Sequence, residues 1–490
     1  MSVVEETIGF GAGRALGGRE PAPGRWPVAT DGGAGLMAGK RKTNPAGSSN
    51  NHRGDVLRVL GVLKVATVDQ IQRIAAPHLT FRHTDKKTPS ERKTARTASH
   101  LGALADLRKH GLVENGGRTR GGEILRNLTP MGLKIAAQEL DRPEGEMGSA
   151  ARGAGRSGAS HPMAVNDAVF ALLRPKPDLA LLDGEPPEAV AAAQRTVAAS
   201  DGLGTLASYA TEVALPATGT WTNPGKGGAQ ADIVLASPED GVPLLFVEID
   251  NCYESAQDLA GKIDKYVRFC RRMVKETDGT ERPMWRTRWW APDGRRGDLP
   301  HPPLLLVFNR LGPRNPNTVI PQLAELTRRH WEGKAYEAFH TYDGKLPIVA
   351  TGMNMLREHG PTGAIFWRFG RGDMQPLPEA IGNPRREASD AHARTEQEAR
   401  EREYEDQLRR TAQQQNAEQE ARRPVCARCS TKFTNERWRA IEPADWGTLR
   451  DSHPRLCDGC KRRAVYSARQ AEQAERDWQE HVQDEAVPEQ

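Results

Sequence analysis

The chain has 490 residues, of which 37% are hydrophobic, and a net charge of +5 at pH 7. This length predicts two or three folded units. No apolar run approaches the ~18–20 residues of a membrane-spanning helix, and the first residues lack the continuous apolar core of a signal peptide. The composition therefore predicts a cytoplasmic protein and excludes the integral membrane class.

The basic residues are concentrated in the first third of the chain. Between Lys40 and Lys134 there are 19 Lys and Arg against 7 Asp and Glu, a local excess of +12 (19 − 7). Such an excess favours an acidic partner, of which nucleic acid is the commonest. A basic surface that meets only solvent explains the same count.

Residues 1–51 are rich in Gly, Ala, Pro and Ser and show no periodicity, which predicts a disordered segment. Residues 52–141 predict three helices and a hairpin. Thr67 is the expected N-cap of the second helix, and Gly111 is the expected left-handed residue after the third. The apolar face of the third helix is expected to consist of Leu101, Leu104 and Leu107.

A Gly/Arg-rich turn joins two short strands after this helix, and Thr129 and Pro130 begin a further helix. Three helices and a basic hairpin predict a winged helix-turn-helix, in which a helix fits the major groove and the hairpin reaches phosphate or the minor groove. The run "LRKHGLVE...LRNLTPMG" resembles the winged helix regions of bacterial regulators. The predicted contacts to double-stranded DNA are Arg92, Lys93, Arg96 and His100 on the helix, and Arg118, Arg120 and Arg126 on the wing. A winged helix that contacts protein is the alternative.

Residues 142–160 have the composition of a linker. Residues 161–382 alternate short apolar strands with helices, which predicts an α/β or mixed α+β sheet flanked by helices. The expected strands have the sequences "ATEVALP", "ADIVLAS", "LLFVEID", "LLLVFN" and "GAIFWRF". The chain as a whole is thus expected to be a multi-domain α/β protein.

The strand "LLFVEIDN" places Glu248 and Asp250 on one face, because strand side chains alternate. A turn at "SPEDGVP" returns the chain from the strand that begins at Asp232, so this carboxylate is expected near the other two. Three converging carboxylates repel one another unless they are protonated or bridged by a cation. Mg²⁺ is a suitable cation, and a bound Mg²⁺ activates water for phosphodiester hydrolysis.

This spacing resembles the PD-(D/E)xK nuclease core, in which Asp, a hairpin and Glu-x-Lys follow one another. Ala231 replaces the Pro of that pattern, and Asp250 replaces the Lys. Lys262 and Lys265 on the following helix are the candidates to supply the lysine. The predicted catalytic residues are Asp232, Glu248, Asp250 and Lys262. Two alternatives stay open: a non-catalytic scaffold with this fold, or simple ion pairs of the carboxylates with Arg268 or Arg271.

Residues 383–423 have almost no large apolar residues and predict a solvated helical spacer with internal charge pairs. Residues 424–465 hold two CxxC pairs, and 466–490 predict a polar helical tail. The pairs predict a structural Zn²⁺ site with the ligands Cys426, Cys429, Cys457 and Cys460. A knuckle followed by a pair at a helix start resembles a treble-clef finger. Redox thiols or an iron–sulfur cluster are the alternatives, and the finger or the spacer is a candidate surface for a protein partner.

The basic N-terminal unit, the "HPMAVND" helix and the run "ADIVL...FVEIDN.YES...L..KIDKY" together resemble the replication-relaxation family of bacterial plasmids and integrative elements. The likeness covers about residues 52–370 and includes Val247 to Asp250, Glu254 and Lys262 to Tyr266. It implies a role in plasmid or mobile-element replication, relaxation or mobilisation, acting on DNA, and does not decide whether the chain cleaves DNA. We expect a DNA-binding protein whose nuclease-like domain is non-catalytic. A Mg²⁺-dependent endonuclease or nickase and a transcriptional regulator are the alternatives, and enzymatic activity stays open.

Overall fold

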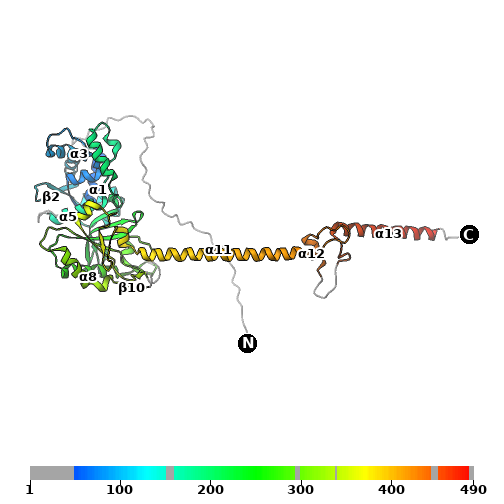
Figure 1. Cartoon of the computed structure of the whole chain (residues 1–490). Coiled ribbons are helices and arrows are strands. Elements are labelled where there is room, and N and C mark those ends of the chain that lie inside the picture. Colours follow the sequence, from blue (N-terminus) through cyan, green and yellow to red (C-terminus); the bar gives the residue numbers. More distant parts are fainter. Residues whose placement is uncertain are drawn as a thin grey trace. The chain divides into compact units, whose positions relative to one another are not determined.

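The computed structural model of the chain describes residues 49–150, 159–276, 278–292, 298–336, 339–442 and 451–484. Two compact units are present (Figure 1). The described residues up to Ala159 form unit 1 together with Lys176–Val197, and Ser160–Pro175 and the chain from Ala198 onward form unit 2. The sequence predicted one continuous domain over 161–382, whereas the segment 176–197 packs in unit 1, where Arg82 lies 3.5 Å from Glu185.

Unit 1 begins with a helix, a short strand and two helices, followed by a hairpin and a further helix. The strands are all antiparallel in the order β1-β3-β2. The elements are α1 Asn50–Leu63, β1 Val65–Thr67, α2 Val68–Ala75, η1 Pro77–Phe81, α3 Pro89–Lys109, β2 Val113–Arg118, β3 Ile124–Leu128, α4 Pro130–Glu139, η2 Glu144–Glu146, η3 Leu179–Leu182 and α6 Pro187–Ala198. Of the predicted disordered segment, residues 1–48 lie outside the described residues, and α1 starts at Asn50.

Local sequence signals explain the boundaries of these helices. Thr67 caps α2 in a reciprocal capping box with Gln70, as predicted. Gly111 follows α3 with φ of +69°, a conformation that glycine adopts without steric cost. The predicted leucine face of α3 is wrong at Leu101, which is 46% exposed. Residues three apart in an α-helix are separated by 300° around its axis, 60° short of a full turn. Each leucine in the series therefore points 60° away from the previous one, and only Leu104 and Leu107 reach the core.

Unit 2 is built on a seven-stranded mixed sheet in the order β14-β13-β12-β9-β6-β5-β4. The strands β6, β9 and β12 at its centre are parallel, and the remaining pairs are antiparallel. The strands of this sheet are β4 Tyr209–Leu215, β5 Ala229–Ser237, β6 Val242–Asp250, β9 Leu304–Phe308, β12 Ile348–Gly352, β13 Phe366–Arg368 and β14 Met374–Gln375. The five predicted strands are therefore present in a mixed α/β fold, and β12 is a central strand that the sequence reading missed.

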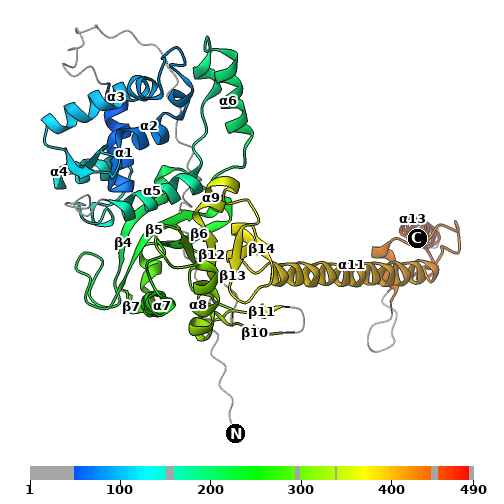
Figure 2. The same ribbon diagram turned by 60° about the vertical axis from the view of Figure 1, so that its left-hand side comes forward.

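Helices cover both faces of this sheet (Figure 2). Helices α7 and α8 lie together on one face and α5 and α9 on the other. The further elements are α5 Ser160–Leu173, η4 Leu206–Ser208, η5 Pro238–Asp240, α7 Ala256–Cys270, β7 Met273–Lys275, β8 Glu281–Pro283, η6 Met284–Thr287, α8 Pro316–Trp331, β10 Lys334–Ala335, β11 His340–Thr341, α9 Met353–His359 and α10 Leu377–Ile381.

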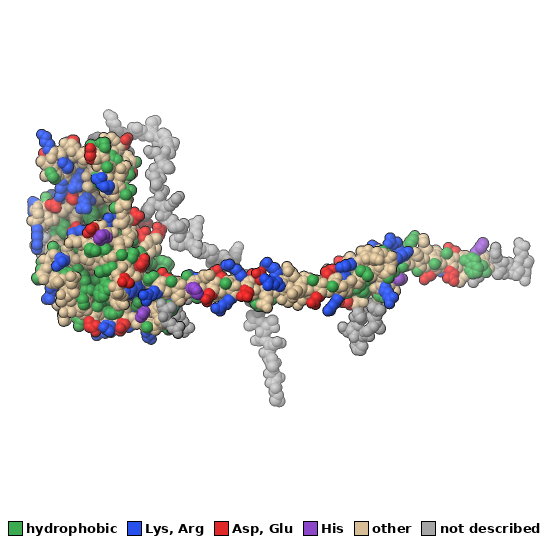
Figure 3. Space-filling view, viewed as in Figure 1, with side chains coloured by type: hydrophobic (Ala, Val, Ile, Leu, Met, Phe, Trp, Pro, Cys, Tyr) green, Lys and Arg blue, Asp and Glu red, His purple; other side chains and the backbone are tan. Residues whose placement is uncertain are grey.

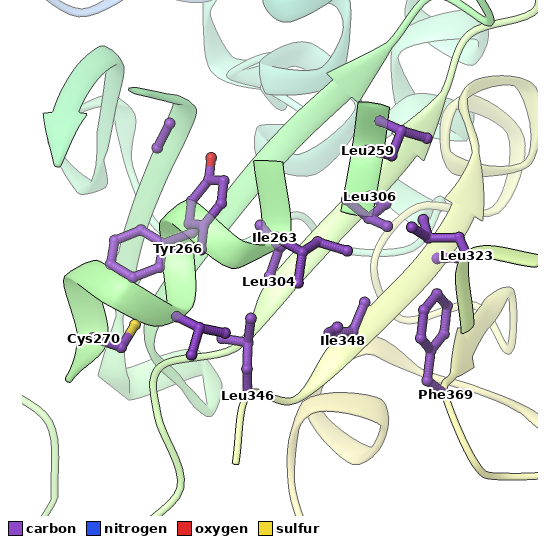
Figure 4. Packing of buried hydrophobic residues seen from close by; sticks show 14 of the residues in the cluster. Leu259, Ile263, Tyr266, Cys270, Leu304, Leu306, Leu323, Leu346, Ile348 and Phe369 are labelled. Carbon is purple, nitrogen blue, oxygen red and sulfur yellow. The ribbon is translucent and has the colours of Figure 1, made fainter. Parts of the chain in front are cut away.

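The core of unit 2 lies between the sheet and helices α7 and α8. Leu259 and Ile263 of α7 and Leu323 of α8 pack on Leu304 and Leu306 of β9 (Figure 4). The ring of Tyr266 joins this cluster while its hydroxyl points away from the apolar side chains. Helix α7 is thus held firmly enough to present polar side chains at a fixed place beside the sheet.

The C-terminal part of the chain is helical apart from the cysteine-rich segment. The predicted spacer is one helix, α11 Pro384–Ala421, none of whose residues is buried. At 1.5 Å per residue its 38 residues span about 57 Å. Positive and negative side chains are interspersed along it (Figure 3), with ion pairs such as Arg402 with Glu398 at i,i+4 spacing. Helices α12 Asn435–Ile441 and α13 Asp458–Asp484 follow, and residues 443–450 and 485–490 lie outside the described residues.

Candidate functional site

The register of the β5–β6 hairpin brings two of the predicted carboxylates together. Ile233 pairs with Val247 in the antiparallel ladder, so the next pair of this register is Asp232 and Glu248. Directly opposite residues point to the same face of a sheet. Asp232 is buried, and its Oδ2 accepts a hydrogen bond of 2.7 Å from the backbone N–H of Ile249.

Two residues that the sequence reading did not select complete the surroundings of Asp232. His161, at the start of α5, has its Nε2 3.0 Å from Asp232 Oδ1, and this contact raises the pKa of His161. Glu212 of β4 is the third member, and one donor atom from each of the three residues lies within 4.8 Å of the others. Glu212 also has φ of +55°, a strained value for a residue with a side chain.

Glu248 is held by two side chains from α7. Lys262 Nζ lies 2.5 Å from Glu248 Oε1 and 2.7 Å from Glu254 Oε1, and the Tyr266 hydroxyl donates a hydrogen bond of 2.9 Å to Glu248 Oε2. Burial and the nearby charge of Asp232 raise the pKa of Glu248 to about 7, although Lys262 opposes the shift. Of the cations considered from the sequence, Lys262 is the one that pairs with Glu248, and Arg268 and Arg271 form no ion pair with it in the described residues.

Asp250 lies apart from this group. Its Oδ1 accepts a hydrogen bond of 2.9 Å from the backbone N–H of Cys252, at the end of β6. Burial raises the pKa of Asp250, and its side chain does not line the cleft that the other carboxylates share. Three carboxylates do share the cleft, as predicted, but they are Asp232, Glu248 and Glu212. Asp250, the predicted third member, lies outside it.

These side chains line one cleft of about 540 Å³ in unit 2. Its polar wall consists of His161, Glu212, Gln230, Asp232, Glu248, Lys262, Lys265 and Tyr266, and its other wall is the glycine-rich connection from β4 to β5. Carboxylate oxygens suit Mg²⁺ and Mn²⁺, and the imidazole favours a transition metal such as Mn²⁺ over Mg²⁺. The donor set therefore fits a cation site, with a buried carboxylate and a lysine beside it that are suited to proton transfer and to charge stabilisation.

The predicted DNA-binding residues of unit 1 differ in their exposure. Arg92, Arg118 and Arg120 are exposed, and none of them forms an ion pair within the described part of the chain. Arg118 donates a hydrogen bond of 2.7 Å to the carbonyl of Gly122, which holds the tip of the hairpin. Arg126 is half-buried and donates to Asn115, and burial lowers its pKa.

Three other predicted DNA-binding residues are engaged within the protein. Lys93 forms an ion pair with Glu123, and Arg96 forms one with Asp69. The His100 ring is fully buried against the ring of His52, with centroids 5.1 Å apart. Helical spacing alone could not separate the core face of α3 from its surface, so His100 was included, and its burial removes it from any DNA-facing surface.

The four predicted zinc ligands do come together. Donor sulfurs of Cys426, Cys429, Cys457 and Cys460 all lie within 4.8 Å of one another. The Sγ atoms of Cys429 and Cys457 are 3.6 Å apart, close to the ~3.8 Å edge of a tetrahedron with Zn–S bonds of ~2.3 Å. A backbone hydrogen bond from Cys457 lowers the pKa of the Cys426 thiol to about 6. This arrangement is compatible with zinc.

A buried ion pair supports the cysteine group from one side. The side chains of Arg437 in α12 and Asp451 are only 2% and 5% exposed, and they form an ion pair that Lys461 joins at 2.6 Å. The hydrogen bond from Arg437 holds the pKa of Asp451 well below its usual range. Arg437 also donates to the backbone carbonyl of Leu456, directly before Cys457, so the pair positions the second CxxC.

Comparison with known proteins supports one family. Residues 57–281 match the model of the replication-relaxation family, and this range contains the basic unit, His161, Asp232, Glu248 and Lys262. No curated protein and no solved structure matched the chain. Every helix within the described ranges is too short or too polar to cross a membrane. The resemblance seen in the sequence is thus confirmed over residues 57–281, the part of the chain that matches the replication-relaxation family.

Proposed function

We propose that this protein binds double-stranded DNA through unit 1 and acts in the replication, relaxation or mobilisation of a plasmid or another mobile element. The family match supports the replication and relaxation role. The observation that carries DNA binding is the exposure of Arg92, Arg118 and Arg120 on α3 and the adjoining hairpin, where no carboxylate of the described residues neutralises them.

The order of elements in unit 1 supports a winged helix for this task. Helix, strand, two helices and a hairpin follow one another, and the hairpin pairs with β1 at the edge of the helices. In this layout α3 enters the major groove and the hairpin follows the backbone. Exposed guanidinium groups at both places donate to phosphate oxygens, so binding depends strongly on salt.

The test compares two arginine variants of the full chain on a labelled duplex. Arg118→Ala combined with Arg120→Ala should weaken binding and lower the slope of log K against log salt by about 2, because each phosphate contact contributes about 1. Arg58→Ala is the matched control, since Arg58 is already paired with Asp55 and Glu139. Equal affinities and slopes for wild type and the double variant would contradict the proposal.

A second candidate function is metal-dependent cleavage of DNA by unit 2. The specific observation in its favour is that His161, Glu212 and Asp232 share one cleft with the Glu248–Lys262 pair. A divalent cation bound by the first three residues would polarise a phosphodiester and lower the pKa of a bound water. Glu248, with its pKa near 7, is matched to accept a proton at neutral pH. Lys262 holds Glu248 in place and offers a positive charge to the phosphate.

Supercoiled plasmid tests this second function directly. Wild-type protein should nick it with Mn²⁺ or Mg²⁺ and not with EDTA, and Asp232→Asn should lower the rate at least 100-fold, on the order of a lost ligand contribution. Glu239→Gln, an exposed carboxylate at the other end of the same hairpin, should leave the rate unchanged. Absence of nicking by wild type under every condition contradicts cleavage and leaves a DNA-binding protein with a non-catalytic nuclease-like sheet.

The cysteine group is proposed to hold one structural Zn²⁺ in a treble-clef-like module. Four thiolates complete a tetrahedral site, so no ligand position is left for catalysis. The knuckle supports this reading, because a bridge between Val425 and Lys432 closes the first CxxC turn and Cys460 lies in the first turn of α13. The module and α11 are the proposed surfaces for a protein partner.

A further inference from the structure

The connection between β4 and β5, residues 216–228, forms one wall of the cleft and continues beyond it. Pro216, Pro224 and Gly227 of this connection line the cleft. Arg272, the second residue after α7, donates a hydrogen bond of 2.8 Å to the carbonyl of Pro216 and a second one to the carbonyl of Gly219. The connection is therefore fastened to the chain just beyond the C-terminal end of α7, the helix whose Lys262 and Lys265 line the cleft.

An aromatic cluster forms around Trp221, in the middle of this connection. Trp221 packs edge-on against Trp289, with ring centroids 5.3 Å apart, and its Nε1 donates a hydrogen bond of 3.0 Å to Thr287 Oγ1. The Arg288 guanidinium lies over both rings, 5.2 Å and 5.4 Å from their centroids. The next residue, Trp290, is 68% exposed. A rigid, charged aromatic base thus supports a tryptophan that projects into solvent.

The surface between the cleft and this cluster is positively charged. Lys226, Lys265 and Arg268 are exposed and form no ion pair in the part of the chain that is described. Gly227 has positive φ and no side chain, and the nearest atom to the place of a Cβ is on the Arg268 guanidinium, 3.6 Å away, so a ligand backbone has close access beside this cation.

We propose that this strip, defined by Lys226, Lys265, Arg268, Arg288 and Trp290, binds an unpaired DNA strand and leads it to the carboxylate cleft. In a duplex the bases are stacked on one another, whereas an unpaired base has a free face for the Trp290 ring. Cations that follow the backbone supply the remaining affinity without sequence preference. The inference deepens the proposed function, on which it rests, by naming a single strand as the ligand of unit 2.

The test measures binding of a fluorescent oligothymidylate to the full chain. Trp290→Ala should lower its affinity about 5- to 150-fold, the range expected for one base–aromatic stack, and Trp290→Phe should restore most of it. Lys265→Gln with Arg268→Gln should lower the salt slope by about 1.4, or ~0.7 for each lost contact. Trp478→Ala on α13 is the matched control, because Trp478 is 65% exposed and lies outside the strip.

A duplex arm separates this inference from the proposed function. Trp290→Ala should bind a blunt duplex as wild type does, whereas Arg118→Ala with Arg120→Ala should weaken duplex binding more than single-strand binding. The inference is contradicted if Trp290→Ala binds oligothymidylate as tightly as wild type, or loses no more affinity than Trp478→Ala does. This conclusion holds even where duplex binding is intact. If duplex binding is absent but the Trp290 effect is present, unit 1 has been misjudged and the strip stands.

Discussion

The two groups of ligand-type side chains in this protein are assembled in opposite ways. The four cysteines come from two CxxC turns, each of which places two sulfurs together over four consecutive residues. The cleft of unit 2 collects its residues from five elements, α5, β4, β5, β6 and α7. With the proposed Zn²⁺, the cysteine group would depend on a cation for its fold, whereas the cleft is held by a large apolar core. Removal of a ligand should therefore affect stability in the first group and chemistry in the second.

The largest effect is expected for the cysteine group. Cys457→Ser should abolish stoichiometric zinc and unfold the segment around it, because structural zinc contributes about 10 kcal/mol or more to such modules. Metal analysis of the purified chain, together with limited proteolysis between residues 424 and 484, measures both. A variant that keeps one zinc per chain and the wild-type cleavage pattern would refute the zinc assignment.

Among the cleft residues, the ion pair of Lys262 with Glu248 has the largest expected effect on the free energy of unfolding. Lys262→Met leaves the buried Glu248 without its cation, which should cost about 3 kcal/mol, the low end for a broken buried pair because Lys262 is 33% exposed. Denaturant unfolding at pH 8 measures this change. Lys265→Met, one turn along the same exposed face, should change stability by less than about 0.5 kcal/mol, and equal losses in both variants would argue against the pair.

The pH dependence of stability should come from Glu248. Its pKa is about 7 in the folded chain against 4.5 for the ordinary group, so the folded state binds more protons and stability falls as pH rises between these values. From pH 5 to pH 8 the loss should be about 2 kcal/mol. Glu248→Gln should flatten this part of the curve; an unchanged slope in that variant would place the titration elsewhere.

The smallest expected effect on stability is that of the Tyr266 hydroxyl, which donates a hydrogen bond to Glu248. Tyr266→Phe keeps the buried ring and removes one hydrogen bond to a charged group, for an expected loss of about 1.5 kcal/mol. The loss should be larger at pH 8 than at pH 5, because Glu248 is ionised only at the higher pH. Tyr209→Phe removes a bond to the neutral carbonyl of Leu203 and should show no such difference. A pH-independent loss at Tyr266 would contradict its role.

Features defined by neighbouring residues were predictable from the sequence. The cap at Thr67, the left-handed Gly111, the strands β5 and β6 and the cysteine group all follow from patterns a few residues long. The hairpin spacing also predicted that Asp232 and Glu248 would meet. These signals are local, so they need no knowledge of how distant elements pack.

Features that depend on tertiary packing were not predictable. Strand β12 has only a short apolar run, and its place at the sheet centre comes from parallel pairing with β9. His161 was seen only as part of a helix motif, and nothing local marks Glu212 as a partner of Asp232. Asp250 was expected in the cleft because it shares a face with Glu248, but the turn after β6 draws its carboxylate to Cys252.

The salt dependence of duplex affinity tests the central claim most directly. For the full chain and a random-sequence duplex, log K should fall linearly with log salt, with a slope of about −3 if Arg92, Arg118 and Arg120 each meet a phosphate. The slope for the variant with all three replaced by Ala should approach zero. A duplex affinity that is undetectable at low salt, or one that does not change between low and high salt, would contradict DNA binding through unit 1.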